Sequence, residues 1–178
     1  IGTGQLYLNS TNALSDVTFV NPINLNGGSR TITVFDNTTA TTDYATISGV
    51  ISGSTGSALT KAGAGLLYLT GANTFSGNTT LSAGTLIVSS IGGGSVATSA
   101  FGDGSGILTV AGGTLVYVGD GETVARKVNV TASAAIDSSG SGPLVFSDLN
   151  FPAGVARTLT LTGTNADGNT LSQPLNDM

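Results

Sequence analysis

The sequence predicts an all-β fold in which the chain winds as a parallel β-solenoid. Three observations lead to this class: short runs of aliphatic and β-branched residues, turn residues that end each run, and segments that recur along the chain. With about 20 residues per coil, we expect residues 1–178 to form a single solenoid segment of roughly eight or nine coils.

The expected strands are rich in Val, Ile, Leu, Thr and aromatic residues, and each is bounded by Gly, Asn, Asp or Ser. No stretch has helical periodicity, and residues that favour helices are scarce. Dipeptides such as Asn26-Gly27 and Asp103-Gly104 supply the positive φ angles that tight corners need. In chain order, we expect strands within residues 6–12, 16–20, 30–35, 45–51, 67–73, 83–88, 106–110, 112–118, 126–130, 143–146 and 158–162.

The recurring segments favour a solenoid over a sandwich or barrel of hairpins, which would also have regularly spaced strands. The pattern L-x-L-x-x-x-N occurs three times, beginning at Leu6, Leu67 and Leu159. The segment AGTLIV at residues 83–88 recurs as GGTLVYV at residues 112–118. A unit that contains a strand, glycines and a polar residue at a fixed distance is typical of a whole coil that stacks on the next.

The spacing of leucines gives the expected size of one coil. Leu67, Leu86 and Leu108 are separated by 19 and 22 residues, which we interpret as two successive coils. Alternate side chains of each strand should point inward and form aliphatic columns, each contributing about 1.5 to 3 kcal/mol. The expected inward residues are Leu67, Leu69, Leu81, Leu86, Val88, Leu108, Val110, Leu115 and Leu159.

Three asparagines, Asn12, Asn73 and Asn165, follow the L-x-L motif at a common distance, where a coil would turn. An inward asparagine at such a turn can bond to backbone groups and to its counterpart on a neighbouring coil. We therefore interpret these three residues as structural rather than as ligands.

Composition and charge exclude several classes of function. Charged residues make up 8% of the chain, the net charge is −5, and the five basic residues are scattered, so we expect no nucleic-acid partner. The absence of cysteine and histidine excludes disulfides, thiolate nucleophiles, imidazole bases and most zinc or copper sites, and we expect no cofactor. No apolar run approaches the roughly 20 residues that span a bilayer, and no signal peptide is evident. We expect a segment of a longer protein that does not itself span a membrane.

Residues 59–88, LTKAGAGLLYLTGANTFSGNTTLSAGTLIV, follow the pattern L-x-K-x-G-x-G-x-L-x-L-x-G-x-N-x-[YF]-x-G-x-T-x-[IL]-x-x-G-T-L. This stretch resembles the autotransporter-associated β-strand repeat, also called the passenger-associated transport repeat. Among its matching residues we expect Gly71, Gly77 and Gly84 to have structural roles. The full set of matching residues is Lys61, Gly63, Gly65, Leu67, Leu69, Gly71, Asn73, Phe75, Gly77, Thr79, Leu81, Gly84, Thr85 and Leu86.

The resemblance implies a right-handed β-helical passenger region at the surface of a Gram-negative bacterium, secreted or held at the outer membrane. It implies a stalk or adhesive role and no catalytic residues. The expected partners are neighbouring solenoid coils or copies of the chain itself, joined into filaments, and also glycans or other surface proteins. The ligand-binding residues remain unknown at this level.

A carbohydrate-active β-helix enzyme is the alternative, because such enzymes need two or more carboxylates on one face. Asp103, Asp120 and Glu122 are the candidates, and the same trio could hold a calcium ion. These acids lie in glycine-rich segments that read as exposed turns, and the regular calcium-binding G-G-x-G-x-D repeat is absent. We therefore interpret them as solvated loop charges and expect a non-catalytic protein.

Overall fold

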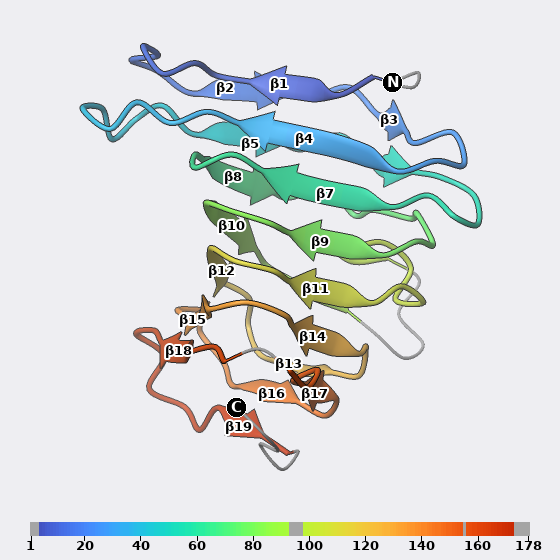
Figure 1. Ribbon diagram of the computed structural model, residues 1–178, viewed down its shortest axis with the longest axis vertical. Helices are drawn as coiled ribbons and strands as arrows, with labels where there is room; N and C mark the ends of the chain where they lie inside the picture. The colour runs from blue at the N-terminus through green and yellow to red at the C-terminus, as the bar shows by residue number, and fades with distance from the viewer. Residues whose placement is uncertain (1–3, 93–97, 155, 173–178) are drawn as a thin grey trace.

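The computed structural model describes residues 4–92, 98–154 and 156–172, and within them the chain forms strands and no helix. The paired strands are parallel to their neighbours and stack along the long axis of the molecule (Figure 1). Asn73 and Ser99 form an isolated antiparallel bridge between loops. Because consecutive strands pair with strands one coil away rather than as hairpins, the predicted parallel β-solenoid is confirmed.

Two seven-stranded sheets form the walls of the solenoid. Sheet A consists of β1 (Leu6–Leu8), β4 (Arg30–Val34), β7 (Leu59–Ala62), β9 (Thr79–Leu81), β11 (Leu108–Val110), β14 (Val128–Val130) and β17 (Leu149–Asn150). Sheet B consists of β2 (Val17–Phe19), β5 (Ala45–Ile47), β8 (Leu66–Leu69), β10 (Thr85–Val88), β12 (Thr114–Tyr117), β15 (Ala134–Ser138) and β18 (Leu159–Thr162).

Shorter strands close the third side of some coils. Near the N-terminus β3 (Ile23–Asn24) pairs with β6 (Ile51–Ser52). Near the C-terminus β13 (Glu122–Val124), β16 (Leu144–Phe146) and β19 (Thr170–Leu171) form a three-stranded sheet. Between these two groups, the described residues of the third side, 70–78, 89–92 and 98–107, lie in loops.

The chain makes about six turns, fewer than the eight or nine that were expected. Leu86 pairs with Leu67, 19 residues earlier, as predicted, but its partner in the next coil is Leu115, 29 residues later. Leu108 lies in sheet A, so the interval from Leu86 to Leu108 is not a coil. Coils that carry long loops contain more residues than the expected 20, and the rod is correspondingly shorter, roughly 30 Å at the spacing of paired strands.

The two sets of recurring segments differ in where they lie in the coils. The segments at residues 83–88 and 112–118 stack directly, because Thr85 pairs with Thr114 and Leu86 with Leu115. The L-x-L-x-x-x-N motifs do not all occupy one position of the coil. The motif at Leu6 belongs to sheet A, whereas those at Leu67 and Leu159 belong to sheet B.

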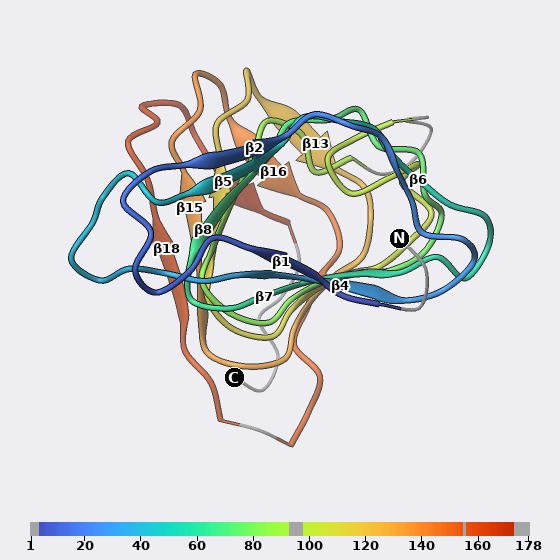
Figure 2. The ribbon, with the colours of Figure 1, turned by 90° about the horizontal axis from the view of Figure 1, so that it is seen from above.

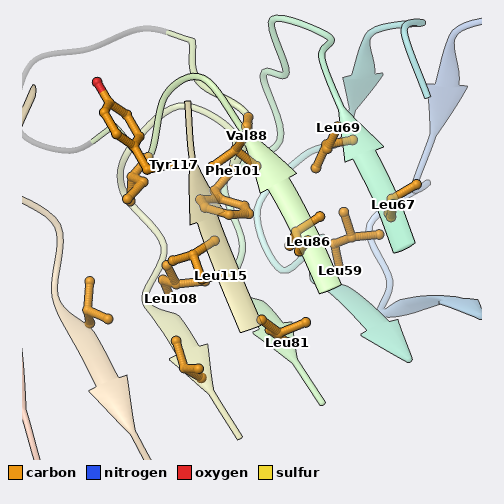
Figure 3. Close-up of a cluster of buried hydrophobic side chains, with 14 of the residues drawn as sticks. Leu59, Leu67, Leu69, Leu81, Leu86, Val88, Phe101, Leu108, Leu115 and Tyr117 are labelled. Carbon is orange, nitrogen blue, oxygen red and sulfur yellow. The ribbon is translucent and has the colours of Figure 1, made fainter. Parts of the chain in front are cut away.

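The core is a column of aliphatic and aromatic side chains between the sheets (Figure 3). In each inner strand, alternate residues are buried, and the intervening residues lie at the surface. Of the inward residues that were expected, all are buried except Leu159, which packs against the core at the C-terminal end and is partly exposed. The alternation in the sequence therefore identifies the core correctly.

The corners that join sheet A to sheet B differ along the rod. In the first two coils they are long loops, residues 9–16 and 35–44. In the next coils they are short, residues 63–65, 82–84 and 111–113. Seen from above, the loop of residues 35–44, in light blue, extends beyond the corners of the later coils (Figure 2).

Candidate functional site

The outer surface carries little positive charge, because four of the five basic side chains are buried. Only Lys127 is exposed. Arg126 donates a hydrogen bond to the Phe101 carbonyl oxygen (3.0 Å), and its guanidinium lies over the Phe101 ring. Arg157 donates to the carbonyl oxygen of Val130 (2.6 Å). A surface of this kind does not favour phosphate, sulfate or carboxylate ligands.

Lys61 lies in β7 with its side chain in the core, 2% exposed. Its ammonium group donates to the carbonyl oxygens of Ala62 (3.1 Å), Gly63 (2.8 Å) and, in the next coil, Ala83 (3.0 Å). Burial lowers the pKa of Lys61 to about 8. No role was predicted for Lys61, although its alternation with Leu59 in L-x-K marks an inward position.

The long corner loops, residues 9–16 and 35–44, are joined by hydrogen bonds, and we call this pair the two-loop platform. The Asn37 side chain donates to the carbonyl oxygen of Ala13 (2.8 Å), and the Thr42 hydroxyl donates to that of Leu14 (2.9 Å). The amide of Asn37 donates to the buried carboxylate of Asp43 (2.5 Å). Polar side chains thus define the shape of loops that contain few aliphatic residues.

Aromatic side chains gather on and beside the two-loop platform. Tyr44, at its end, meets Tyr68 of β8 edge to face, with ring centroids 5.2 Å apart and an interplanar angle of 72°. Tyr7 and Phe35 form a second pair, stacked with centroids 5.9 Å apart, and both are exposed. Aromatic residues farther along the chain are in the core, including Phe75, Phe101, Tyr117, Phe146 and Phe151.

A hollow of about 250 Å³ lies between the platform and the neighbouring coils. Tyr44 also borders an adjoining shallow surface formed with Thr46, Tyr68 and Thr70. Together these surfaces form one site, which we call the Tyr44 site, and it offers aromatic rings, hydroxyls and the Asp36 carboxylate to a ligand. The residues that line the hollow are Asp36, Ala40, Thr41, Asp43, Tyr44, Ala64, Leu66 and Thr85.

The acids that were considered as a catalytic or calcium-binding trio have separate partners. Asp103 accepts hydrogen bonds from the hydroxyl (2.6 Å) and amide (3.0 Å) of Ser105, and the hydroxyl lowers the pKa of Asp103. Asp120 accepts a hydrogen bond from the Ser141 hydroxyl (2.7 Å).

Glu122 lies in β13, and its carboxylate accepts hydrogen bonds from the backbone amides of Ile91 (2.8 Å) and Gly92. It therefore fastens the loop that follows β10 to the next coil. Within residues 4–92, 98–154 and 156–172, no three Asp, Glu, His or Cys side chains gather closely enough to hold a metal ion. Each of the three carboxylates accepts hydrogen bonds from serine or backbone donors of its own.

The asparagines singled out in the sequence lie in different surroundings. Asn73 is fully buried, where its side chain accepts from the Ile51 amide (2.7 Å) and donates to the Ala100 carbonyl oxygen (2.7 Å). Asn165 is partly buried and donates to the Gly142 carbonyl oxygen. Asn12 is exposed at a turn of the platform, so the structure does not place it inside a coil.

The three glycines of the repeat lie against backbone of the preceding coil. A Cβ atom at Gly77 would be 1.9 Å from the Ser57 carbonyl oxygen, and one at Gly71 would be 2.6 Å from that of Gly49. At Gly84 a Cβ would be 2.4 Å from the Gly63 carbonyl oxygen, and φ is +72°. No larger residue fits these places without moving the coil above.

The parallel coils and the hydrogen bonds that buried polar side chains make between them define the chain as a β-solenoid repeat protein. The model of the passenger-associated-transport-repeat family matches residues 59–88, so this chain contains a repeat of autotransporter passengers. These residues run from β7 to β10 and include Lys61, Asn73 and the three glycines above.

A curated relative is the Adhesin BmaC autotransporter of Brucella suis biovar 1 (strain 1330), which is 36% identical over 160 residues. The match covers 83% of this chain but 4% of that protein, so the chain spans a small part of its relative's length. No solved structure matches the chain significantly. The described residues contain no helix that is long and apolar enough to cross a membrane.

Proposed function

We propose that this chain is a non-catalytic structural and adhesive segment of an autotransporter passenger, displayed at the surface of a Gram-negative bacterium. Its similarity to an autotransporter adhesin along 160 residues carries the proposal. The similarity extends well beyond the 59–88 repeat, so it covers most of the solenoid rather than one coil.

Two features of the molecule suit this role. The parallel coils give a rod whose shape depends on backbone pairing and a continuous core, as a stalk requires. The Tyr44 site adds a hollow with aromatic and hydroxyl side chains near one end of the rod, and Asp103, Asp120 and Glu122 each accept hydrogen bonds from serine or backbone donors.

The proposal is tested by displaying the chain on a non-adherent Gram-negative cell, fused to an autotransporter translocator. Cells that display it should adhere to cultured epithelial cells severalfold more than cells that display an unrelated solenoid of similar length. Surface display is measured with an antibody to an N-terminal tag. Equal display without increased adhesion would contradict the adhesive role and leave a stalk role only.

A further inference from the structure

The geometry points to a ligand for the Tyr44 site: a neutral pyranose sugar, such as a terminal residue of a surface glycan. This inference rests on the adhesive role proposed above and names the chemistry of the partner. It depends on the aromatic pair, on the polar groups around the hollow and on the charge of the surface.

The aromatic pair offers the apolar part of the site. Tyr68 points outward from β8 between Thr46 of β5 and Ile87 of β10, which are its partners in neighbouring coils. Tyr44 meets it nearly at a right angle. The C–H groups of a pyranose carry a small positive charge and pack well on the electron-rich face of an aromatic ring. Two rings at a right angle can contact a sugar on a face and along an edge.

The polar groups beside these rings suit the sugar's hydroxyls. The hollow is lined by the hydroxyl residues Thr41 and Thr85 and by the half-buried Asp36, while Thr46 and Thr70 flank the rings. Threonine hydroxyls both donate and accept hydrogen bonds, and carboxylates accept them from hydroxyl groups. The hollow's volume of about 250 Å³ is suited to one sugar ring rather than to a folded partner.

The charge of the Tyr44 site disfavours anionic and cationic ligands. The described residues that line the site include two acids and no base, which disfavours sialic acid, sulfated glycans and phosphate. A lysine-rich peptide would need free carboxylates, but Asp43 is 5% exposed and already accepts a hydrogen bond from the Asn37 amide. Asp36 alone is a weak counterpart for a cationic peptide, whereas hydroxyl groups dominate the rest of the site.

The test uses the purified chain and four neutral disaccharides: maltose, cellobiose, lactose and diacetylchitobiose. At millimolar sugar, saturation-transfer NMR should show contact between protein and ring protons of at least one of them. In the variants Tyr68→Val and Tyr44→Ser, affinity should fall by about tenfold or more, since each removes one stacking ring. Asp36→Asn should weaken binding severalfold.

Tyr7→Ser is the matched control, because Tyr7 is an exposed tyrosine of the other aromatic pair and lies outside the site. Its affinity should equal that of the unchanged chain, and circular dichroism checks that each variant is folded. Tyr68→Phe keeps the ring and should keep most of the binding. The inference is overturned if none of the four sugars binds, if Tyr7→Ser weakens binding as much as Tyr68→Val, or if tetralysine binds instead. This experiment uses no cells. If the purified chain bound none of the sugars but displayed cells still adhered, the proposed ligand would be wrong and the adhesive role would stand.

Discussion

The second and third coils connect sheet A to sheet B with corners of different length. Both pass from sheet A to sheet B, and their strands are in register, with Ile32 opposite Lys61 and Ala45 opposite Leu67. The second coil makes the passage with the loop of residues 35–44, and the third makes it with residues 63–65. Register within the sheets is therefore independent of corner length.

The two kinds of corner depend on different interactions. The tight corners place glycines with positive φ one above another, since φ is +79° at Gly63, +72° at Gly84 and +73° at Gly113. The long corner instead uses side-chain bonds, such as the amide of Asn37 to Asp43. Tight corners build the rod, and long corners create the surface on which a ligand can bind.

Substituting a tight-corner glycine should have the largest effect on stability. Gly84→Val combines an unfavourable φ with a Cβ 2.4 Å from a carbonyl oxygen of the preceding coil, and should lower the free energy of unfolding by about 3 to 5 kcal/mol. Urea unfolding measures the loss.

Variants of two other glycines separate the cost of the unfavourable φ from the cost of the close contact between coils. Gly154 has a φ of +97° and open space around it, so Gly154→Val should cost only the conformational part, about 1 to 2 kcal/mol. Gly168 has open space and no positive φ, and Gly168→Val should change stability by less than about 0.5 kcal/mol. Equal losses at all three positions would refute close coil packing as the cause.

The buried Lys61 should make stability depend on pH in the alkaline range. Its pKa is about 8 in the folded chain against an ordinary 10.5, so between these values the unfolded chain holds a proton that the folded chain has lost. Stability should therefore rise with pH from about 8, gaining about 2 kcal/mol by pH 9.5. Unfolding midpoints at intervals from pH 7 to 9.5 measure this rise.

Two lysine variants check that Lys61 causes the rise in stability with pH. Lys61→Met should remove the alkaline rise, whereas Lys127→Met, at the exposed lysine, should keep it. A flat profile in the unchanged chain would mean that its three carbonyl partners keep the ammonium of Lys61 charged.

Exchanging the two kinds of corner should affect stability less than replacing Gly84 does. Replacing residues 35–43 by Gly-Ala-Gly, the sequence of residues 63–65, leaves the paired strands intact and shortens a loop, so the free energy of unfolding should change by about 1 kcal/mol or less. The same change removes Asp36, Thr41 and Asp43 from the hollow, and sugar binding should be lost. Unfolding and NMR titration measure the two results, and a chain that fails to fold would show that the platform holds the first coils together.

Local patterns explain what could be predicted. Alternation in segments such as residues 66–69 and 85–88 identified inward residues correctly, because a strand turns successive side chains to opposite faces. The repeat at residues 59–88 was recognised by its resemblance to the family pattern, in which the lysine and the glycines stand at fixed distances along the chain. The inward position of Lys61 was visible in the same alternation and was missed because lysine is rarely buried.

The remaining features depend on contacts between coils. The number of coils was overestimated because the loops of residues 9–16 and 35–44 and the loop after β10 each lengthen a coil without changing the pattern of the strands. Asn12 and Asn73 share a motif, yet only Asn73 meets backbone groups of other coils that bury it. The sequence around each asparagine does not contain those partners.

The solenoid class and most of the aliphatic core could be predicted from local patterns, since both follow from the period of two and from recurring turns. The hollow lined by Asp36, Tyr44, Leu66 and Thr85 could not be predicted in this way, because these residues come from three successive coils. Stacking brings residues about 20 to 30 positions apart into contact, and the length of each intervening loop sets which residues meet.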